Sequence, residues 1–189
     1  MANPFENIRQ AAGNKQLDRS LRWYRENLKV LASTRPESLM TNRTDLVNQI
    51  LPGNMYMFFY DAKFKDTLPF WDRFPLILAY KKVENGFYGI NLHYLPYMVR
   101  FKILGAMHNY ITSENIDDNT KIRINWQIIE SAARLEPAKA CVKHYLNDHV
   151  NSRFLKIKYP DWITASQLPV ERFVGASKEK VWRETRKKY

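Results

Sequence analysis

Cysteine and glycine are scarce in this chain: its 189 residues include one cysteine, Cys141, and 6 glycines. A single thiol forms neither an internal disulfide nor a thiolate metal site, which favours a reducing, cytosolic origin. Few glycines and only 9 prolines exclude a collagen-like or low-complexity chain. No stretch approaches the roughly 18 apolar residues of a membrane span, and residues 1–10 lack the apolar core of a signal peptide. We therefore expect a soluble, intracellular globular protein.

Positive charge is what the chain has in excess. Hydrophobic residues (45%) and aromatic residues (14%) exclude a disordered polycation, yet 30 Lys and Arg outnumber 19 Asp and Glu, for a formal net charge of +11. The excess is 8 − 5 = +3 in residues 1–50, 7 − 4 = +3 in 51–104, 8 − 6 = +2 in 105–160 and 7 − 4 = +3 in 161–189. One dense cluster lies within the last twelve residues: Lys178, Lys180, Arg183, Arg186, Lys187 and Lys188.

So broad a positive field favours a polyanionic partner, either nucleic acid or an acidic protein surface. The alternative is that most of these side chains only solvate the surface. Composition leaves both interpretations open.

The N-terminal part, residues 1–52, is predicted to be a helical arm followed by a linker. Apolar residues recur at helical spacing over residues 16–32, at Leu17, Leu21, Tyr24, Leu28 and Leu31. The opposite face of this helix carries four basic residues: Arg19, Arg22, Arg25 and Lys29.

Residues 53–176 are predicted to form an α+β domain. Its β-rich stretches are residues 55–60, 74–83, 87–95, 154–159 and 170–174. Asn85-Gly86 predicts a two-residue hairpin turn with positive φ angles, and Gly89 predicts a bulge or a close backbone approach. The order of the elements is one strand, a long loop, a hairpin, a strand, a helical turn and a short last strand. This order is typical of a small SH3-like β-barrel of about five strands.

A helical insertion, residues 96–150, interrupts this barrel. Pro96 opens its first helix, with Tyr97, Phe101, Leu104, His108 and Ile111 as the inward stripe. Its second helix is capped by Asp117, Asp118 or Asn119 and buries Ile122, Trp126, Ile129 and Ala133. A shorter helical piece, KACVKHYLNDHV, follows. Residues 177–189 form a basic C-terminal helix capped by Ser177.

Catalytic and metal-binding patterns are weak. The histidines, His93, His108, His144 and His149, form no HExxH pair, and Cys141 sits among apolar neighbours. No phosphate-binding or dinucleotide-binding glycine loop and no nucleophile elbow occurs. A metal-dependent nuclease would need carboxylates as metal ligands. The carboxylates of this chain are better explained as helix caps and as partners in loop ion pairs. We expect no catalytic residues, no cofactor and no metal.

The loop YDAKFKDTLPFWDRFPL mixes aromatics, prolines and alternating charges. Lys63, Lys65, Phe70 and Trp71 are the residue types of a stacking and phosphate-binding surface. The interpretation that we favour is structural: Phe70, Trp71 and Phe74 cap the barrel, and Asp72 pairs with Arg73 or another base.

Four long motifs carry a family resemblance: MYMFFYDAKFKDTLPFWDRFPL, NGFYGINLHYLP, CVKHYLNDHV and LPVERFVGASKEKVWRETRK. Over residues 20–188 the chain resembles a family of virion proteins of large contractile-tailed bacteriophages, whose members are labelled DNA end protector or head-completion proteins. The resemblance implies a minor structural protein at the head-to-tail junction or elsewhere in the particle. It implies no catalytic residues.

Two functional hypotheses follow. The first is a non-enzymatic virion protein that binds or shields packaged genomic DNA ends at the head–tail junction. The second is a tail, baseplate or neck assembly component that contacts only proteins; a metal-dependent nuclease ranks last. Expected partners are portal, neck, tail or baseplate proteins in a symmetric multi-copy assembly and, under the first hypothesis, double-stranded DNA ends, but no membrane. The protein would be located in the virion, and in the host cytoplasm during assembly.

The candidate residues for binding DNA or an acidic partner are Arg19, Arg22, Arg25, Lys29, Lys63, Lys65, Trp71, Lys178, Lys180, Arg183, Arg186, Lys187 and Lys188.

Overall fold

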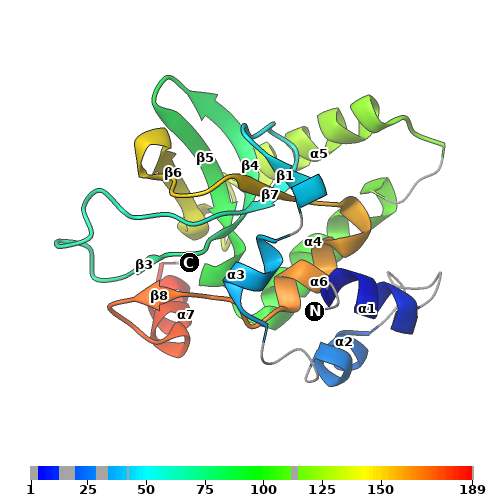
Figure 1. The fold of residues 1–189 in the computed structure, drawn as a ribbon, viewed down its shortest axis with the longest axis horizontal. Coiled ribbons are helices and arrows are strands. Elements are labelled where there is room, and N and C mark those ends of the chain that lie inside the picture. Colours follow the sequence, from blue (N-terminus) through cyan, green and yellow to red (C-terminus); the bar gives the residue numbers. More distant parts are fainter. Residues whose placement is uncertain (1–3, 13–19, 29–33, 42, 112–114, 189) are drawn as a thin grey trace.

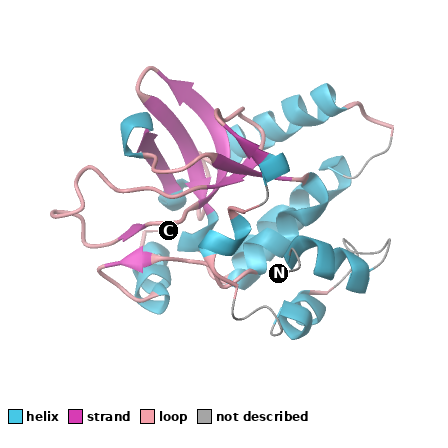
Figure 2. Ribbon diagram, in the orientation of Figure 1, coloured by secondary structure: helices cyan, strands magenta, loops and turns pink. Residues whose placement is uncertain are grey.

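The computed structural model describes residues 4–12, 20–28, 34–41, 43–111 and 115–188 (Figures 1 and 2). The α-helices of these residues are α1 (Pro4–Ala12), α2 (Leu21–Leu28), α3 (Pro36–Leu39), α4 (Tyr97–Ile111), α5 (Asp118–Ala132), α6 (Trp162–Gln167) and α7 (Lys178–Arg186). The strands are β1 (Leu46–Val47), β2 (Met55–Met57), β3 (Trp71–Asp72), β4 (Leu76–Val83), β5 (Gly86–Asn91), β6 (Val142–Leu146), β7 (Phe154–Ile157) and β8 (Phe173–Val174). Short 3-10 turns are η3 (Arg43–Asp45), η4 (Leu92–Tyr94), η5 (Lys139–Cys141), η6 (Asn147–His149) and η7 (Tyr159–Asp161).

An antiparallel sheet in the order β1-β7-β2-β4-β5-β6 forms the centre of the molecule. In β2, Met55 lies opposite Leu78 of β4 on one side and opposite Ile157 of β7 on the other. Strands β3 and β8 form a separate ribbon in which Trp71 lies opposite Val174. Figure 2 shows this ribbon apart from the main sheet. The protein therefore combines helices with a mainly antiparallel sheet, as the sequence predicts.

Strand β2 is buried on both faces, which explains its unbroken apolar sequence. Met55 and Met57 pack into a large core shared with the helices. Tyr56 and Phe58 point into a second core on the opposite face of the sheet. There the Phe58 ring meets three others edge-on, with centroid distances of 5.6, 5.3 and 5.1 Å to Phe87, Tyr145 and Phe154. Many of the aromatic residues thus serve the core.

The predicted closed SH3-like barrel is wrong, because the described sheet is open. Its edge strands are β1 and β6, which do not pair with each other. The expected last strand pairs with Trp71–Asp72 as β8 instead of joining the main sheet. The reason is the segment KACVKHYLNDHV, predicted to be helical, which forms strand β6 and occupies the free edge of β5. With β7 bonded to β2 on the other side, no central strand offers a free edge to the chain end.

The β4–β5 hairpin is confirmed, but its turn differs from the predicted one. Val83 pairs with Gly86, so the turn residues are Glu84 and Asn85, and no described non-glycine residue has a positive φ. A glycine is needed at 86 because a Cβ there would lie 2.0 Å from the Tyr145 carbonyl oxygen in the neighbouring strand. Opposite Gly89, the register of β4 shifts between Ala79 and Lys81, which confirms the predicted bulge.

The predicted starts of α4, α5 and α7 are confirmed. Pro96 precedes α4, whose first bonded amides donate to its carbonyl. Asp117 caps α5 by accepting from the Thr120 amide at 3.0 Å, and Ser177 caps α7 by accepting from the Lys180 amide at 3.3 Å. The predicted buried stripes are only partly correct: Arg100 and Asn125 are fully buried, whereas Trp126 is exposed. The side chains of His108 and Ile111 lie outside the described part of the chain.

The N-terminal helices pack on the body of the protein. Helices α1 and α2 both contact α6, and Phe5, Ile8 and Tyr24 are buried in the large core. The predicted N-terminal helix spans residues 16–32; α2 is its described part, since 13–19 and 29–33 lie outside the described residues. Within the described part of the chain, none of the helices has the length and apolar character needed to cross a bilayer.

Candidate nucleic-acid interface

A pocket of about 410 Å³ lies where the loop of residues 61–70 meets β6 and the end of α7. Figure 1 shows this loop projecting between β6 and α7 on one side of the molecule. The loop is folded by its own backbone: the amides of Thr67 and Leu68 both donate to the Phe64 carbonyl, at 3.0 and 2.9 Å. The pocket is lined by Tyr60, Ala62, Lys63, Phe64, Leu68, Pro69, Phe70, Trp71, Asp72, Tyr94, Ala140, Lys143, His144, Tyr145, Leu146, Thr185 and Lys188.

Three lysines, Lys63, Lys143 and Lys188, line this pocket. Lys143 is partly buried; its amine donates to the Ala140 carbonyl at 3.1 Å and lies 4.4 Å from the centroid of the Tyr94 ring. Burial lowers the pKa of the Lys143 amine, and the positive charge of Lys188 acts in the same direction. Because three lysines line it, the pocket is electropositive.

The mouth of the pocket is apolar and aromatic. Phe64 is 62% exposed and Leu68 is 43% exposed, although both are large hydrophobic residues. The Lys63 amine lies 5.5 Å from the centroid of the Phe64 ring. Deeper in the pocket, Trp71 and Tyr145 are buried. A cationic pocket with an exposed ring can hold both the phosphate and the base of a nucleotide.

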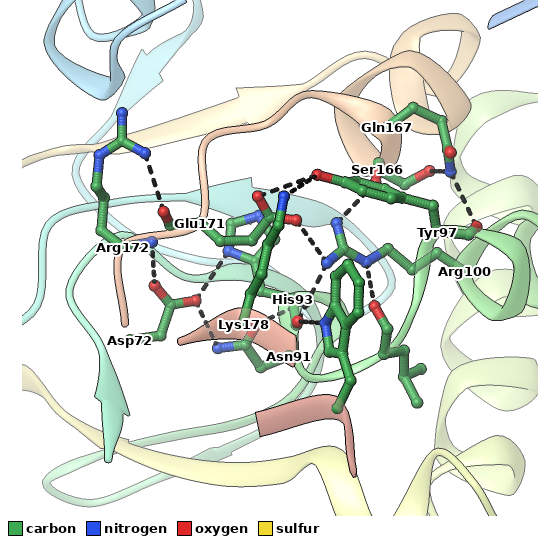
Figure 3. A network of polar contacts seen from close by, with 12 residues as sticks. Asp72, Asn91, His93, Tyr97, Arg100, Ser166, Gln167, Glu171, Arg172 and Lys178 are labelled. Atoms are coloured by element: carbon green, nitrogen blue, oxygen red, sulfur yellow. Dashed lines mark hydrogen bonds and ion pairs between the residues drawn. The ribbon is translucent and has the colours of Figure 1, made fainter. Parts of the chain in front are cut away.

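A buried polar network, shown in Figure 3, reaches the pocket at Asp72. The Asp72 carboxylate lies 2.8 Å from His93 Nδ1 and accepts from the Asn91 amide at 3.2 Å and from the backbone of Phe74 at 3.1 Å. Burial alone would raise the pKa of Asp72, but the charge of His93 and these hydrogen bonds outweigh it and lower the pKa. Asp72 therefore pairs with His93, another base as the prediction allowed, and not with Arg73.

A second buried pair joins α4 to the segment that precedes β8, next to α7. Arg100 donates to Glu171 at 2.7 Å and also to the carbonyls of Leu95, Ser166 and His93 (Figure 3). Trp182 of α7 donates to the same His93 carbonyl at 2.9 Å. Burial alone would raise the pKa of Glu171, but the Arg100 charge outweighs it and lowers the pKa. The basic helix α7 is thus linked, through Trp182, to a carbonyl that Arg100 also binds.

Gly175 lets the chain between β8 and α7 contact the pocket loop. It has φ +85°, and a Cβ there would lie 2.7 Å from the Pro69 carbonyl oxygen. We expect Gly175→Ala to lower the free energy of unfolding by about 1–3 kcal/mol, because the substitution adds left-handed strain and a backbone clash. Urea unfolding measures the change.

Gly105→Ala is the matched control for Gly175→Ala. Gly105 lies within α4, and apart from its chain neighbours and the backbone of its own helix, none of the described atoms is within 4 Å of an added Cβ. Alanine there should raise the free energy of unfolding by about 0.5–1 kcal/mol. Equal changes at the two glycines would contradict the assigned backbone geometry at Gly175.

The structure brings together three of the residues predicted from the sequence: Lys63, Trp71 and Lys188 all line the pocket. Lys65 instead borders a neighbouring hollow and pairs with Asp61 at 2.8 Å. The Lys178 amine is 3.5 Å from the Tyr97 hydroxyl. The exposed basic side chains on or just after α7 are those of Lys180, Arg183, Arg186, Lys187 and Lys188.

The predicted cluster on the N-terminal helix lies elsewhere. Arg22 is exposed and pairs with Glu26 at 2.8 Å. Arg19 and Lys29 lie outside the described residues, and the side chain of Arg25 does too.

Sequence reasoning missed Phe64, Lys143, His144 and Tyr145 as pocket residues. The last three lie on β6, in the segment predicted to be a helix. A strand interpretation would have placed Lys143 and Tyr145 on one face, since side chains two apart share a face. In the described part of the chain, His, Cys, Asp and Glu side chains do not gather in groups of three or more that could hold a metal. Burial raises the pKa of Cys141 to about 12.

Comparison with known protein families matches residues 3–187 to the family described as phage T4 terminal DNA protecting protein. Searches of curated proteins and of solved structures gave no match. The family match covers nearly the whole chain, including the pocket loop, β6 and α7. The chain therefore belongs to the family of phage terminal DNA protecting proteins.

Proposed function

We propose that the protein is a non-enzymatic virion component that binds and shields the ends of packaged double-stranded DNA at the head–tail junction. One observation carries the proposal: two basic segments from opposite halves of the chain, around Lys63 and Lys188, meet at one pocket with an exposed aromatic ring. The family match supports the same function.

The physical chemistry of end protection suits this chain. A protector must bind any terminal sequence, so it contacts phosphates rather than base edges. A net charge of +11 supplies the long-range attraction, and the docked helix α7 presents exposed cations beside the pocket. Protection is then steric: the bound protein covers the terminus that an exonuclease must enter.

The test is exonuclease protection of linear duplex DNA. We expect the purified full-length chain to slow digestion from the ends, with an affinity that falls by orders of magnitude between about 50 and 200 mM salt. Circular duplex of the same sequence is the matched competitor. If protection is missing at low salt, or if the circle competes as well as the linear form, the protein does not bind ends.

A second candidate function is a neck, tail or baseplate component that contacts only other virion proteins. It is favoured by exposed apolar side chains away from the pocket, among them Leu51 at 53% and Trp126 at 37%. Trp126 borders a groove with Lys81 and Lys82, which suits an acidic protein surface. A particle reconstruction that places multiple copies among tail proteins, far from DNA density, would support this function over the first.

A further inference from the structure

The carboxylates of the described residues do not neutralise the three lysines of the pocket. In the described part of the chain, the ion pairs within 4 Å do not involve Lys63, Lys143 or Lys188. Lys143 is the most informative, because a lysine that is largely withdrawn from water normally has a counter-charge. Its one hydrogen bond, to Ala140, leaves two ammonium protons available. The pocket therefore offers amine donors that suit an anionic ligand.

The acid that lines the pocket does not supply that anion. Asp72 is 4% exposed, and its carboxylate oxygens already accept from His93, Asn91 and the backbone amides of Phe74 and Arg172. The negative charge of Asp72 is therefore already stabilised by these donors and does not neutralise the pocket lysines. An incoming phosphate would meet the three amines.

The residues at the mouth of the pocket indicate which other part of the ligand binds together with the phosphate. The Phe64 ring is exposed beside the Lys63 amine. Base stacking on an exposed aromatic ring is tolerant of sequence, as binding to arbitrary ends requires. A volume of about 410 Å³ is at the small end of ligand pockets, which span roughly 300–1,000 Å³, and suits one nucleotide rather than a base pair.

We infer that this pocket binds a single unpaired terminal nucleotide of the DNA through its terminal phosphate. The inference rests on the proposed function and narrows it to one kind of end. A terminal phosphate monoester carries close to two negative charges at neutral pH, whereas each internal phosphate carries one, so three amines distinguish an end from the interior. The base at an end also leaves the stack at the lowest cost.

The first experiment uses deoxyadenosine 5′-monophosphate as the probe and the full chain, followed by NMR or by tryptophan fluorescence. We expect saturable binding that adenosine lacking the phosphate does not show. Lys143→Met, Lys63→Ala and Lys188→Ala should each weaken binding about tenfold or more, the loss typical of one charge-assisted hydrogen bond. Lys65→Ala is the matched control, since its amine is bound to Asp61 and borders the neighbouring hollow; its effect should stay below about twofold.

Phe64→Ala tests the stacking contact. We expect it to weaken nucleotide binding without affecting binding of inorganic phosphate, because only the base uses the ring. Leu51→Ala, another exposed apolar residue, should change neither. Saturable nucleotide binding that is unchanged in all four pocket variants, each verified to be folded by its unfolding curve, would overturn the assignment. So would a complete lack of nucleotide binding by the wild-type chain.

The second experiment separates failure of the pocket from failure of the proposed function. Linear duplexes with and without 5′-phosphates are compared for binding and for exonuclease protection. We expect wild type to prefer the phosphorylated end and Lys143→Met to lose that preference while keeping its affinity for circular DNA. If ends with and without the terminal phosphate are protected equally well, and Lys143→Met protects them as well as wild type does, the assignment of the pocket is wrong but the proposed function is not. If wild type protects no end, the proposed function fails whatever the nucleotide result.

Discussion

Arg100→Met should lower the free energy of unfolding by about 3–5 kcal/mol, the typical cost of breaking a buried ion pair from one side. Arg100 is fully buried, and its guanidinium holds Glu171 and three backbone carbonyls. Methionine preserves much of the side-chain volume but leaves the Glu171 carboxylate without a charge partner. Urea denaturation monitored by circular dichroism measures the loss.

Two further variants identify the source of that loss. Arg134→Met removes an exposed arginine that pairs with Glu130 at 3.3 Å, and it should cost about 0–1 kcal/mol. Adding Glu171→Leu to Arg100→Met should recover part of the stability, since it removes the isolated charge. A loss below about 1 kcal/mol for Arg100→Met would show that the buried pair contributes little to the stability of the fold.

Neutralising the outer face of the C-terminal segment should have the largest effect on DNA binding in general. We expect the triple variant Arg183→Ala, Arg186→Ala, Lys187→Ala to bind linear duplex roughly 100-fold more weakly at low salt. The slope of log affinity against log salt should decrease by as much as about 3. All three side chains are exposed, so the fold should be preserved. Fluorescence anisotropy over a salt series measures both quantities.

The charge-matched control removes three basic residues from α5 and the turn after it: Lys121, Arg123 and Arg134. Figure 1 shows α5 and α7 at opposite ends of the molecule. Both triple variants lower the net charge of +11 by three. Equal losses in the two variants would mean that diffuse charge, and not the α7 face, binds the DNA.

Local features of this fold could be predicted from the sequence because a few neighbouring residues determine them. The β4–β5 hairpin, the start of α4 at Pro96 and the Ser177 cap of α7 are examples. Strand β6 could not be predicted in this way. Its segment has no strict periodicity, and it becomes a strand because the edge of β5 is available to it.

The pocket was predictable only in part. Lys63 and Trp71 stand out in an unusual loop, and Lys188 stands out in a basic cluster, but no sequence signal indicates that they meet. Lys143 reaches the pocket only because β6 is a strand, and Arg100 lies within an apolar helical stripe with a partner 71 positions away. The environments of Lys143 and Arg100 are therefore determined by contacts between segments that are far apart in the sequence.

The two-sided burial of β2 has a consequence for how the sheet finds its alignment during folding. Where one face of a strand is polar, a slip by one residue is penalised by exposing its apolar side chains. Here a slip would exchange Met55 and Met57 with Tyr56 and Phe58, apolar for apolar, so polarity provides no penalty. Side-chain size must discriminate instead, with methionines beneath the helices and rings on the other face. Between β5 and β6, Gly86 adds a steric constraint, since a Cβ there would lie 2.0 Å from the Tyr145 carbonyl oxygen.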